Sequence, residues 1–307
     1  MWEVIWRAGS FLLVICAGYL LRRLGIFGPR EYDVLLRVVM NLTIPAAIII
    51  SFADFRMDLS LLGVALLGLG LNVLMMALAA AVTRNRDRNT RILHLMNLCG
   101  YNVGCFALPF LQGFVGPYGV ALACLFDVGN SLVATGGGYA VAESLLREGE
   151  RRSFSLWDTL KKLLRVVPFV TYLCLIVYTA AGLRVPGAVV TLLTPMANAN
   201  AFAAMLMIGL MVDFRMERRE RGTVLRVVGL RGGLSLLLAA GLYFLLPVGE
   251  ETRRVLAILA LSPISMLSSG FTAQLGGPVG TSAAINSIYA VFSVAAMSVL
   301  VVLFGIS

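Results

Sequence analysis

The sequence predicts an all-α polytopic membrane protein with ten transmembrane helices, and three features support this prediction. Hydrophobic residues make up 59% of the 307 residues and the mean hydropathy is +0.90, whereas soluble domains contain about 45 to 50% apolar residues. Ten apolar runs, most of them long enough to cross a bilayer, are separated by charged clusters and Gly/Pro turns. A short sequence also recurs in both halves of the chain, which favours an internal repeat.

The ten predicted spans follow one another with short connections. The first has Trp2 and Glu3 where a signal peptide needs a basic region, and no small-residue cleavage site follows it, so we interpret it as a span. All five cysteines lie within apolar runs without a CxxC pair, so neither disulfides nor a metal site is predicted. The spans cover residues 4–21, 34–52, 59–82, 92–115, 118–146, 163–182, 185–212, 224–246, 255–275 and 279–306.

Lysines and arginines are distributed unevenly between the two sides of the predicted membrane. Alternate connections hold nineteen of the 25 basic residues and the opposite connections hold five, while Arg231 lies within a span. Because positively charged loops stay in the cytoplasm, we expect a multi-pass protein of the plasma membrane with both termini extracytoplasmic. The same topology accounts for the net charge of +9, so nucleic acid is not expected as a partner.

An internal repeat is predicted across a short central linker. Residues 41–57 (NLTIPAAIIISFADFRM) and 200–216 (NAFAAMLMIGLMVDFRM) have the same length, begin with Asn and end in DFRM. Chance similarity between such short segments is the alternative. Five spans in each half would orient the halves oppositely, as in the inverted repeats of secondary transporters. The predicted units are an N-terminal repeat (1–146), a cytoplasmic linker (147–162) and a C-terminal repeat (163–307).

The fourth and ninth spans contain residues that interrupt helices. Residues 97–109 include two glycines, two asparagines and a proline, and residues 262–270 include Pro263 and four serines. Proline costs about 3 kcal/mol in a helix interior, and glycine about 1 kcal/mol relative to alanine. Unwound backbone is tolerated at membrane depth only where it is buried or lines a wet cavity. We therefore predict two broken helices that cross and form a binding site; the alternative is a pair of kinked, closely packed helices.

Three stretches resemble the auxin efflux carrier family. Residues 101–133 (YNVGCFALPFLQGFVGPYGVALACLFDVGNSLV) are similar to its fourth and fifth spans, residues 41–49 (NLTIPAAII) to its second, and residues 262–277 (SPISMLSSGFTAQLGG) to its ninth. The resemblance implies ten spans in two inverted five-helix repeats with broken crossover helices 4 and 9. It further implies a scaffold of spans 1, 2, 6 and 7, a transport bundle of spans 3–5 and 8–10 that moves like an elevator, and a homodimer formed through the scaffold.

Two departures from the plant members bear on the expected substrate. Tyr101 stands where plant carriers have a proline, and the central linker is short. The chain is therefore more similar to the bacterial branch of the family, whose members are associated with small carboxylates such as malate and malonate. The sequence leaves the substrate and the direction of transport open.

The candidate substrate-binding residues come from the two crossover segments and from polar positions in neighbouring spans. By position, the resemblance places the first three below in one crossover and the next two in the other. The asparagines of spans 5 and 10 either bind substrate or join neighbouring helices. The candidates are Asn102, Gly104, Pro109, Pro263, Ser265, Ser268, Asn130 and Asn286.

Two charged residues within spans are candidates for coupling or charge compensation. Asp127 falls near the bilayer midplane and favours a cation or a transferable proton, whereas Arg231 favours an anion. We hypothesise that Asp127 offsets the positive ends of the half-helices and titrates during transport. The alternative for Asp127 is a permanently ionised partner of a basic group or of backbone amides. The alternative for Arg231 is a side chain that extends to the cytoplasmic interface.

The function predicted from these features is secondary active transport of a small organic anion, with a proton as one candidate for the coupling ion. A sodium-coupled carrier of the bile-acid symporter type has the same ten-span plan, but sodium needs several oxygen ligands in one place. A channel would need a continuous polar pore, which no segment indicates. No protease motif such as HExxH is present and the only histidine, His94, falls near the surface, so neither an enzyme nor a cofactor is expected.

Overall fold

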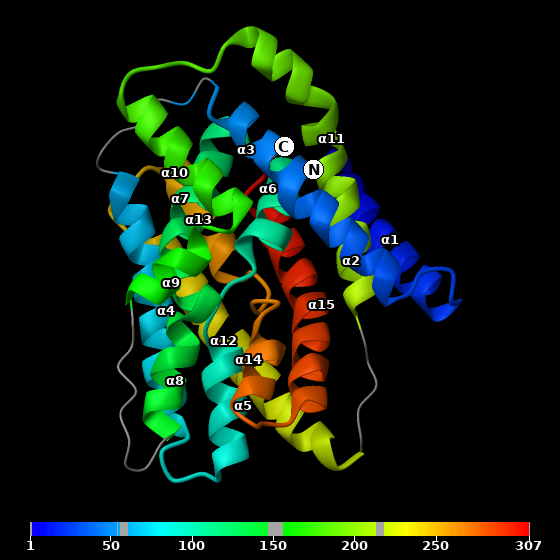
Figure 1. Ribbon diagram of the computed structural model, residues 1–307, viewed down its shortest axis with the longest axis vertical. Helices are drawn as coiled ribbons and strands as arrows, with labels where there is room; N and C mark the ends of the chain where they lie inside the picture. Colours follow the sequence, from blue (N-terminus) through cyan, green and yellow to red (C-terminus); the bar gives the residue numbers. More distant parts are fainter. Residues whose placement is uncertain (1, 54, 56–60, 147–155, 213–217, 307) are drawn as a thin grey trace.

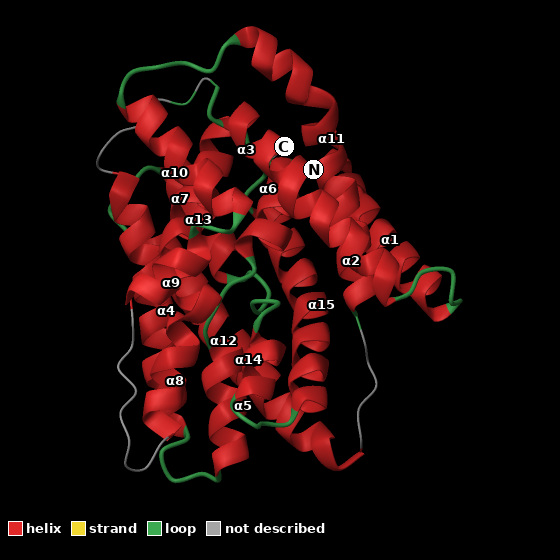
Figure 2. Cartoon of the chain, in the orientation of Figure 1, coloured by secondary structure: helices red, strands yellow, loops and turns green. Residues whose placement is uncertain are grey.

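The computed structural model describes residues 2–53, 55, 61–146, 156–212 and 218–306. Regular structure in these ranges is helical (Figure 2), apart from an isolated β-bridge between Tyr101 and Ile264. The helices are α1 (Trp2–Arg23), α2 (Pro29–Val38), η1 (Val39–Thr43), α3 (Ile44–Ser51), α4 (Leu62–Val82), α5 (Arg88–Leu98), η3 (Val103–Ala107), α6 (Leu108–Gln112), α7 (Pro117–Leu132), η4 (Val133–Gly137), α8 (Gly138–Leu146), α9 (Leu156–Leu163), α10 (Val167–Ala180), α11 (Gly187–Met211), η5 (Arg218–Glu220), α12 (Arg221–Leu245), α13 (Glu250–Ala260), α14 (Ser268–Gln274) and α15 (Val279–Leu303).

Seven helical stretches within the described residues are long and apolar enough to cross a membrane. They coincide with seven of the predicted spans, namely the first, second, third, fifth, seventh, eighth and tenth. The protein is therefore a multi-pass membrane protein. The seven stretches are Ile5–Arg23, Pro29–Ser51, Leu62–Val82, Pro117–Leu146, Gly187–Met211, Arg218–Leu245 and Val279–Leu303.

The other three predicted spans do not form uninterrupted helices of that length. The fourth is divided at residues 99–102, and the ninth is divided at residues 261–267. In the sixth, α10 has only 14 residues, because it begins next to Pro168 and is preceded by Val166 in extended conformation. The prediction of ten spans thus depends on segments that are short or divided in the structure.

Close helix contacts are made through glycines. Gly18 of α1 and Gly209 of α11 lie against each other's backbone, and Gly129 of α7 lies against the backbone of Ala65 in α4. A side chain at any of these positions would meet backbone atoms, so only glycine allows the helices to approach this closely. These contacts join α1 with α11, and α4 with α7, as closely packed pairs.

Two groups of helices differ in height in Figure 1. The helices α5 and α8 extend well below the turn between α1 and α2, which lies at mid-height on the right-hand edge of Figure 1. The helices α1, α2 and α3 each pack against α11, whereas α5 packs against α8, α12 and α14. The interrupted residues 99–102 directly follow α5, and residues 261–267 directly precede α14.

The repeat predicted from residues 41–57 and 200–216 is only partly within the described residues. Its DFRM ends, residues 54–57 and 213–216, fall almost entirely outside them. The two asparagines that begin the segments are in different environments. Asn41 is exposed and donates to the carbonyl of Arg37, whereas Asn200 is buried and bonds with Thr43 and Gln112.

Candidate functional site

The first interruption begins where α5 ends at Leu98. Cys99 is extended, and Gly100 has a φ of +76°, a left-handed conformation that other residues rarely adopt. Helical structure resumes at Val103, and Pro109 lies in the first turn of α6, where its missing N–H is not needed. The helix is therefore broken at Gly100 and resumes at Val103, six residues before Pro109.

The second interruption, residues 261–267, meets the first one directly. The N–H of Asn102 donates to the carbonyl of Pro263 at 2.8 Å, and the N–H of Ser265 donates to the carbonyl of Gly100 at 3.1 Å. Tyr101 and Ile264 form an antiparallel bridge between these bonds. Each unwound segment thus satisfies backbone groups of the other, as a non-aqueous environment requires. We call residues 99–102 and 261–267 together the junction.

Side-chain amides from two helices hold the first half of the junction. Asn130 of α7 accepts from the N–H of Tyr101 at 2.9 Å and donates to the carbonyl of Tyr101 at 2.8 Å. Asn72 of α4 accepts from the N–H of Gly100 at 2.6 Å and donates to Asn130 at 3.1 Å. Asn130 therefore joins neighbouring structural elements, which was one of its two predicted roles.

Asp127 lies one helical turn before Asn130 and is buried. One carboxylate oxygen accepts from the Asn130 amide at 2.8 Å, and the other accepts from the hydroxyl of Tyr172 at 2.8 Å. Among the described residues no basic side chain forms an ion pair with Asp127. A Cβ added at Gly104 would lie 3.4 Å from both Asp127 and Tyr172, so glycine leaves space beside the carboxylate.

A cavity of about 290 Å³ lies between the junction, α7 and α10; we call it the junction cavity. Among the residues that line the cavity, Asp127 carries a charge and the others are uncharged. The Asn102 side chain has no hydrogen-bond partner within the described residues. Five of the predicted site residues line the cavity: Asn102, Gly104, Asp127, Asn130 and Ser265.

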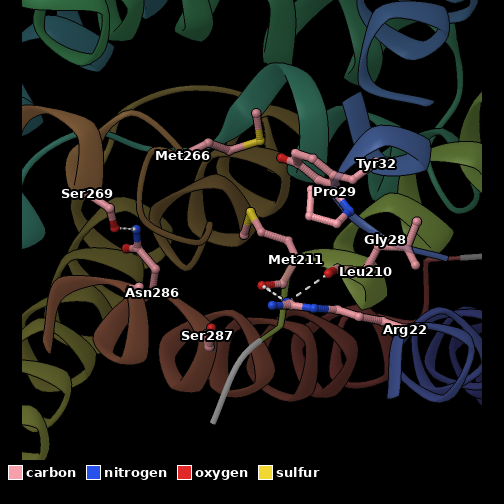
Figure 3. Close-up of a pocket in the computed structure, with 11 residues that line it drawn as sticks. Arg22, Gly28, Pro29, Tyr32, Leu210, Met211, Met266, Ser269, Asn286 and Ser287 are labelled. Atoms are coloured by element: carbon pink, nitrogen blue, oxygen red, sulfur yellow. Dashed lines mark hydrogen bonds between the residues drawn. The ribbon is translucent and has the colours of Figure 1, made fainter. Parts of the chain in front are cut away.

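The remaining predicted polar residues form a separate cluster. Asn286 of α15 donates to the hydroxyls of Ser268 at 2.8 Å and Ser269 at 3.1 Å, while Asn97 accepts from Ser282 at 3.0 Å. Figure 3 shows Asn286 and Ser269 at one side of a second cavity, of about 330 Å³, with Arg22 on another side. The structure therefore does not place Ser268 and Asn286 in the junction cavity.

Arg231 does not extend to the cytoplasmic interface, so that interpretation was wrong. The side chain is 0% exposed, because α12 turns this position toward the junction rather than toward the surface. Its guanidinium carbon lies 4.5 Å from the ring centroid of Tyr101 and 5.5 Å from that of Tyr289. Its Nη2 donates to the carbonyl of Gly100 at 3.3 Å.

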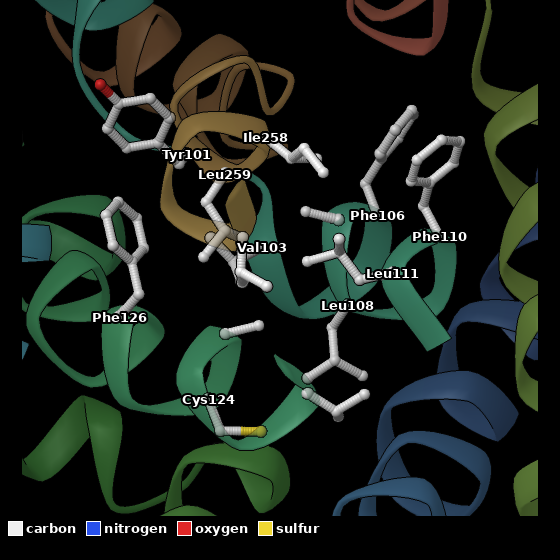
Figure 4. Close-up of a cluster of buried hydrophobic side chains, with 14 of the residues drawn as sticks. Tyr101, Val103, Phe106, Leu108, Phe110, Leu111, Cys124, Phe126, Ile258 and Leu259 are labelled. Atoms are coloured by element: carbon white, nitrogen blue, oxygen red, sulfur yellow. The ribbon is translucent and has the colours of Figure 1, made fainter. Parts of the chain in front are cut away.

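Apolar side chains support the first interrupted segment from one side. The rings of Tyr101 and Phe126 lie 5.7 Å apart with their planes at 70°. Figure 4 shows these rings beside Val103, while Phe106 and Phe110 of the following turns continue the same cluster. Pro109 is buried in this part of the protein and does not line the cavity, and neither does Pro263. The structure therefore does not place these two prolines in the junction cavity.

Two residues of the site were missed in the sequence. Asn72 is a lone polar residue in the apolar run of α4, and it could have been found by the signal used for Asp127. Tyr172 gave no such signal, since a tyrosine in an apolar helix is common. Both belong to spans in which no interruption was predicted.

Comparison with known proteins indicates a membrane transporter. Residues 10–162 match a protein family described as "Membrane transport protein". An "Uncharacterized transporter" of Methanothermobacter thermautotrophicus is 27% identical over 266 residues, which cover 85% of each chain. Both descriptions indicate a transporter rather than an enzyme. Together with the motifs in residues 41–49, 101–133 and 262–277, these matches make the chain similar to the auxin efflux carrier family of membrane transport proteins.

Proposed function

We propose that this protein is a secondary active transporter that moves a small organic anion across the plasma membrane by alternating access. The junction cavity is the observation that carries the proposal. Polar groups of two interrupted helices, including Asn102 and Ser265, converge there on a buried space of about 290 Å³. Interrupted helices at membrane depth are the usual place for a transporter to hold its substrate.

The proposed architecture is ten spans in two inverted repeats, with α5–α6 and α13–α14 as the crossover helices. Spans 1, 2, 6 and 7 would form the scaffold and the dimer contact, and the other six would move as an elevator. The different heights of α5 and of the turn after α1 support a bundle displaced relative to the scaffold (Figure 1). In this arrangement the bond between Tyr172 and Asp127 would join the scaffold to the bundle.

Groups that line the junction cavity support the proposed charge of the substrate. Donors are available from the unpartnered Asn102 amide and the Ser265 hydroxyl, and both suit a carboxylate. Asp127 would repel an anion while it is ionised, because the two charges would share one buried space. We therefore propose that a carboxylate enters together with a proton that neutralises Asp127.

Uptake into proteoliposomes tests this function. Purified protein would be supplied with radiolabelled malonate, malate or pyruvate under a pH gradient, a sodium gradient or neither. We expect saturable uptake of at least one acid, with counterflow, stimulated by an acidic exterior. Stimulation by sodium alone would favour the bile-acid type of cycle instead. Non-saturable flux without counterflow would indicate a channel, and no flux of any acid would overturn the proposal.

Two variants locate the site within the protein. We expect Asn102→Ala to lower the ratio of kcat to KM about tenfold or more, since it removes a charge-assisted donor to the substrate. Asn41→Ala is the matched control, because Asn41 is exposed and bonds only to its own helix. Equal activity of the two variants would show that the junction cavity does not hold the substrate.

A further inference from the structure

Arg231 is a buried positive charge for which the described residues supply no carboxylate partner. Its Nε and Nη1 are buried and have no hydrogen-bond partner among the described residues, and only Nη2 reaches a carbonyl, that of Gly100. An unpaired buried charge is strongly unfavourable. Its presence therefore needs a compensating negative charge in at least one working state of the protein.

Arg231 and Asp127 contact the same segment of the junction. Arg231 stacks on the ring of Tyr101 and bonds to Gly100, whereas Asp127 is linked through Asn130 to the backbone of Tyr101. They form no ion pair with each other. Asp127 lines the junction cavity, whereas Arg231 does not line it and lies behind Tyr101, which does. The charge of Arg231 therefore acts on the cavity through the low-dielectric interior rather than by direct contact.

The groups that face each charge are few. Asp127 is faced by Tyr172 from α10 and lines the cavity together with Cys105 from η3. Arg231 is faced by Cys99 and Tyr101 from the junction and by Tyr289 from α15. Because none of these neighbours is an acid or base at neutral pH in its ordinary state, Asp127 and Arg231 set the charge of this region.

We propose that Arg231 determines the selectivity for a carboxylate, because its single positive charge compensates one negative charge in the junction cavity. With the cavity empty, Arg231 and ionised Asp127 together give this region no net charge, although they form no ion pair. When the substrate enters, Asp127 takes a proton from the same aqueous side, and Arg231 offsets the substrate's carboxylate instead. The moving bundle thus has the same net charge empty and loaded, and each cycle carries one proton with one negative charge. This inference rests on the proposed function.

The wild-type protein provides the first test, with radiolabelled pyruvate in liposomes whose potential is set by potassium and valinomycin. A cycle of one proton with one monovalent anion is electroneutral. We expect accumulation to rise about tenfold for each unit of pH gradient. We also expect it to stay constant when the potential changes by about 100 mV, a change that would shift the distribution of one net charge about 50-fold. A strong response to the potential would overturn the inference.

Variants of Arg231 test its part in selectivity. Competition by pyruvate and by its uncharged amide, pyruvamide, would be compared in wild type, Arg231→Gln and Arg231→Lys. We expect Arg231→Gln to weaken binding of pyruvate about tenfold or more while leaving that of pyruvamide almost unchanged. Arg231→Lys should retain most of the preference for the acid. Arg226→Gln, an exposed position on the same helix, is the matched control.

The outcomes separate the inference from the function beneath it. If wild type takes up pyruvate and Arg231→Gln keeps the same preference for acid over amide, the inference is wrong and the transporter function stands. If Arg231→Gln does not fold, the potential dependence of the wild type and the preference of Arg231→Lys decide. A wild type that transports no acid would overturn both proposals together.

Discussion

The two interrupted segments of the junction are anchored in different ways. Side-chain amides of Asn72 and Asn130 bond to the backbone of residues 99–102 from two separate helices. Backbone bonds join Pro263 to Asn102 and Ser265 to Gly100, and the N–H groups of residues 261 and 262 donate back to carbonyls of α13. The hydroxyl-rich cluster around Asn286 begins only after the second segment, at Ser268. The first segment is therefore positioned by the surrounding helices, and the second is positioned largely by the first.

The surroundings of the two interrupted segments also differ in their charge. The side next to the first segment has a carboxylate, Asp127, tied to α10 through Tyr172. The cluster beyond the second segment consists of uncharged amides and hydroxyls, including Asn97, Ser268 and Asn286. Coupling to protons can thus reside in the N-terminal half alone, although both halves contribute to the cavity.

The largest expected effect is on stability and comes from Asn130. Asn130→Ala removes four hydrogen bonds and leaves the N–H and carbonyl of Tyr101 unsatisfied. We expect the free energy of unfolding to fall by about 3 to 5 kcal/mol. Asn286→Ala removes two bonds to serines, and we expect a loss of about 1 kcal/mol. Denaturant unfolding in micelles measures both, and equal losses would refute the proposed difference between the segments.

Replacing Asp127 should act on the pH dependence of transport. Asp127→Asn removes the carboxylate that would bind the coupling proton. We therefore expect that uptake by this variant no longer rises as the exterior is acidified. Wild-type uptake should rise about tenfold between roughly pH 7.5 and pH 5.5. Initial rates at several values of external pH give the comparison, and Asn286→Asp shows whether a carboxylate in the other cluster can substitute. An unchanged pH profile in Asp127→Asn would remove the proton role.

A smaller effect is expected from Tyr172. Tyr172→Phe deletes the hydrogen bond between α10 and Asp127 and keeps the ring. We expect a loss of about 1.5 to 3 kcal/mol of stability, as for a bond to a charged group, with a changed pH profile of uptake. Tyr178→Phe on the same helix is the control, since its hydroxyl bonds to the carbonyl of Arg184 near the surface. Identical profiles in the two variants would show that Tyr172 does not act on Asp127.

The smallest effect concerns the start of the helix that leads to the first interruption. Hydrogen bonds from the backbone and the side chain of Thr90 hold the pKa of Asp87 below its ordinary value of 3.8. The contribution of Asp87 is therefore fully present above about pH 4 and is lost as the pH falls through the lowered pKa. We expect Asp87→Ala to cost about 1 kcal/mol at neutral pH.

Thermal unfolding of Asp87→Ala and of the exposed control Asn89→Ala at pH 7 measures this difference. The difference between the two variants should shrink in acid. A difference that grows as the pH falls would contradict the role of Asp87 as an ionised helix cap.

Much of the fold could be predicted because apolar runs and helix-breaking residues are local signals. The interruption at Gly100 follows from a residue that tolerates a left-handed conformation, and the one near Pro263 from a residue without an N–H. The number of full-length helices was harder to predict, since the sixth span looks continuous in hydropathy although α10 has only 14 residues. Whether the two halves are inverted repeats stays a prediction.

The site could be predicted only in part, because spacing along a helix gives depth and not direction. Asp127 and Asn102 were found as polar residues at membrane depth, and both line the junction cavity. For Arg231, distance along α12 suggested that it could reach the interface, yet the side chain points into the protein. Asn286 was grouped with Asn130 by sequence similarity, although the fold places it in a different cluster.

The most direct test of the account is an experimental structure of the protein with the acid that it transports best. We expect the carboxylate of that acid to lie in the junction cavity, within hydrogen-bond distance of the Asn102 amide and beside Asp127. A carboxylate bound elsewhere would contradict the account. So would helices that run unbroken through residues 99–102 and 261–267 with no cavity between them.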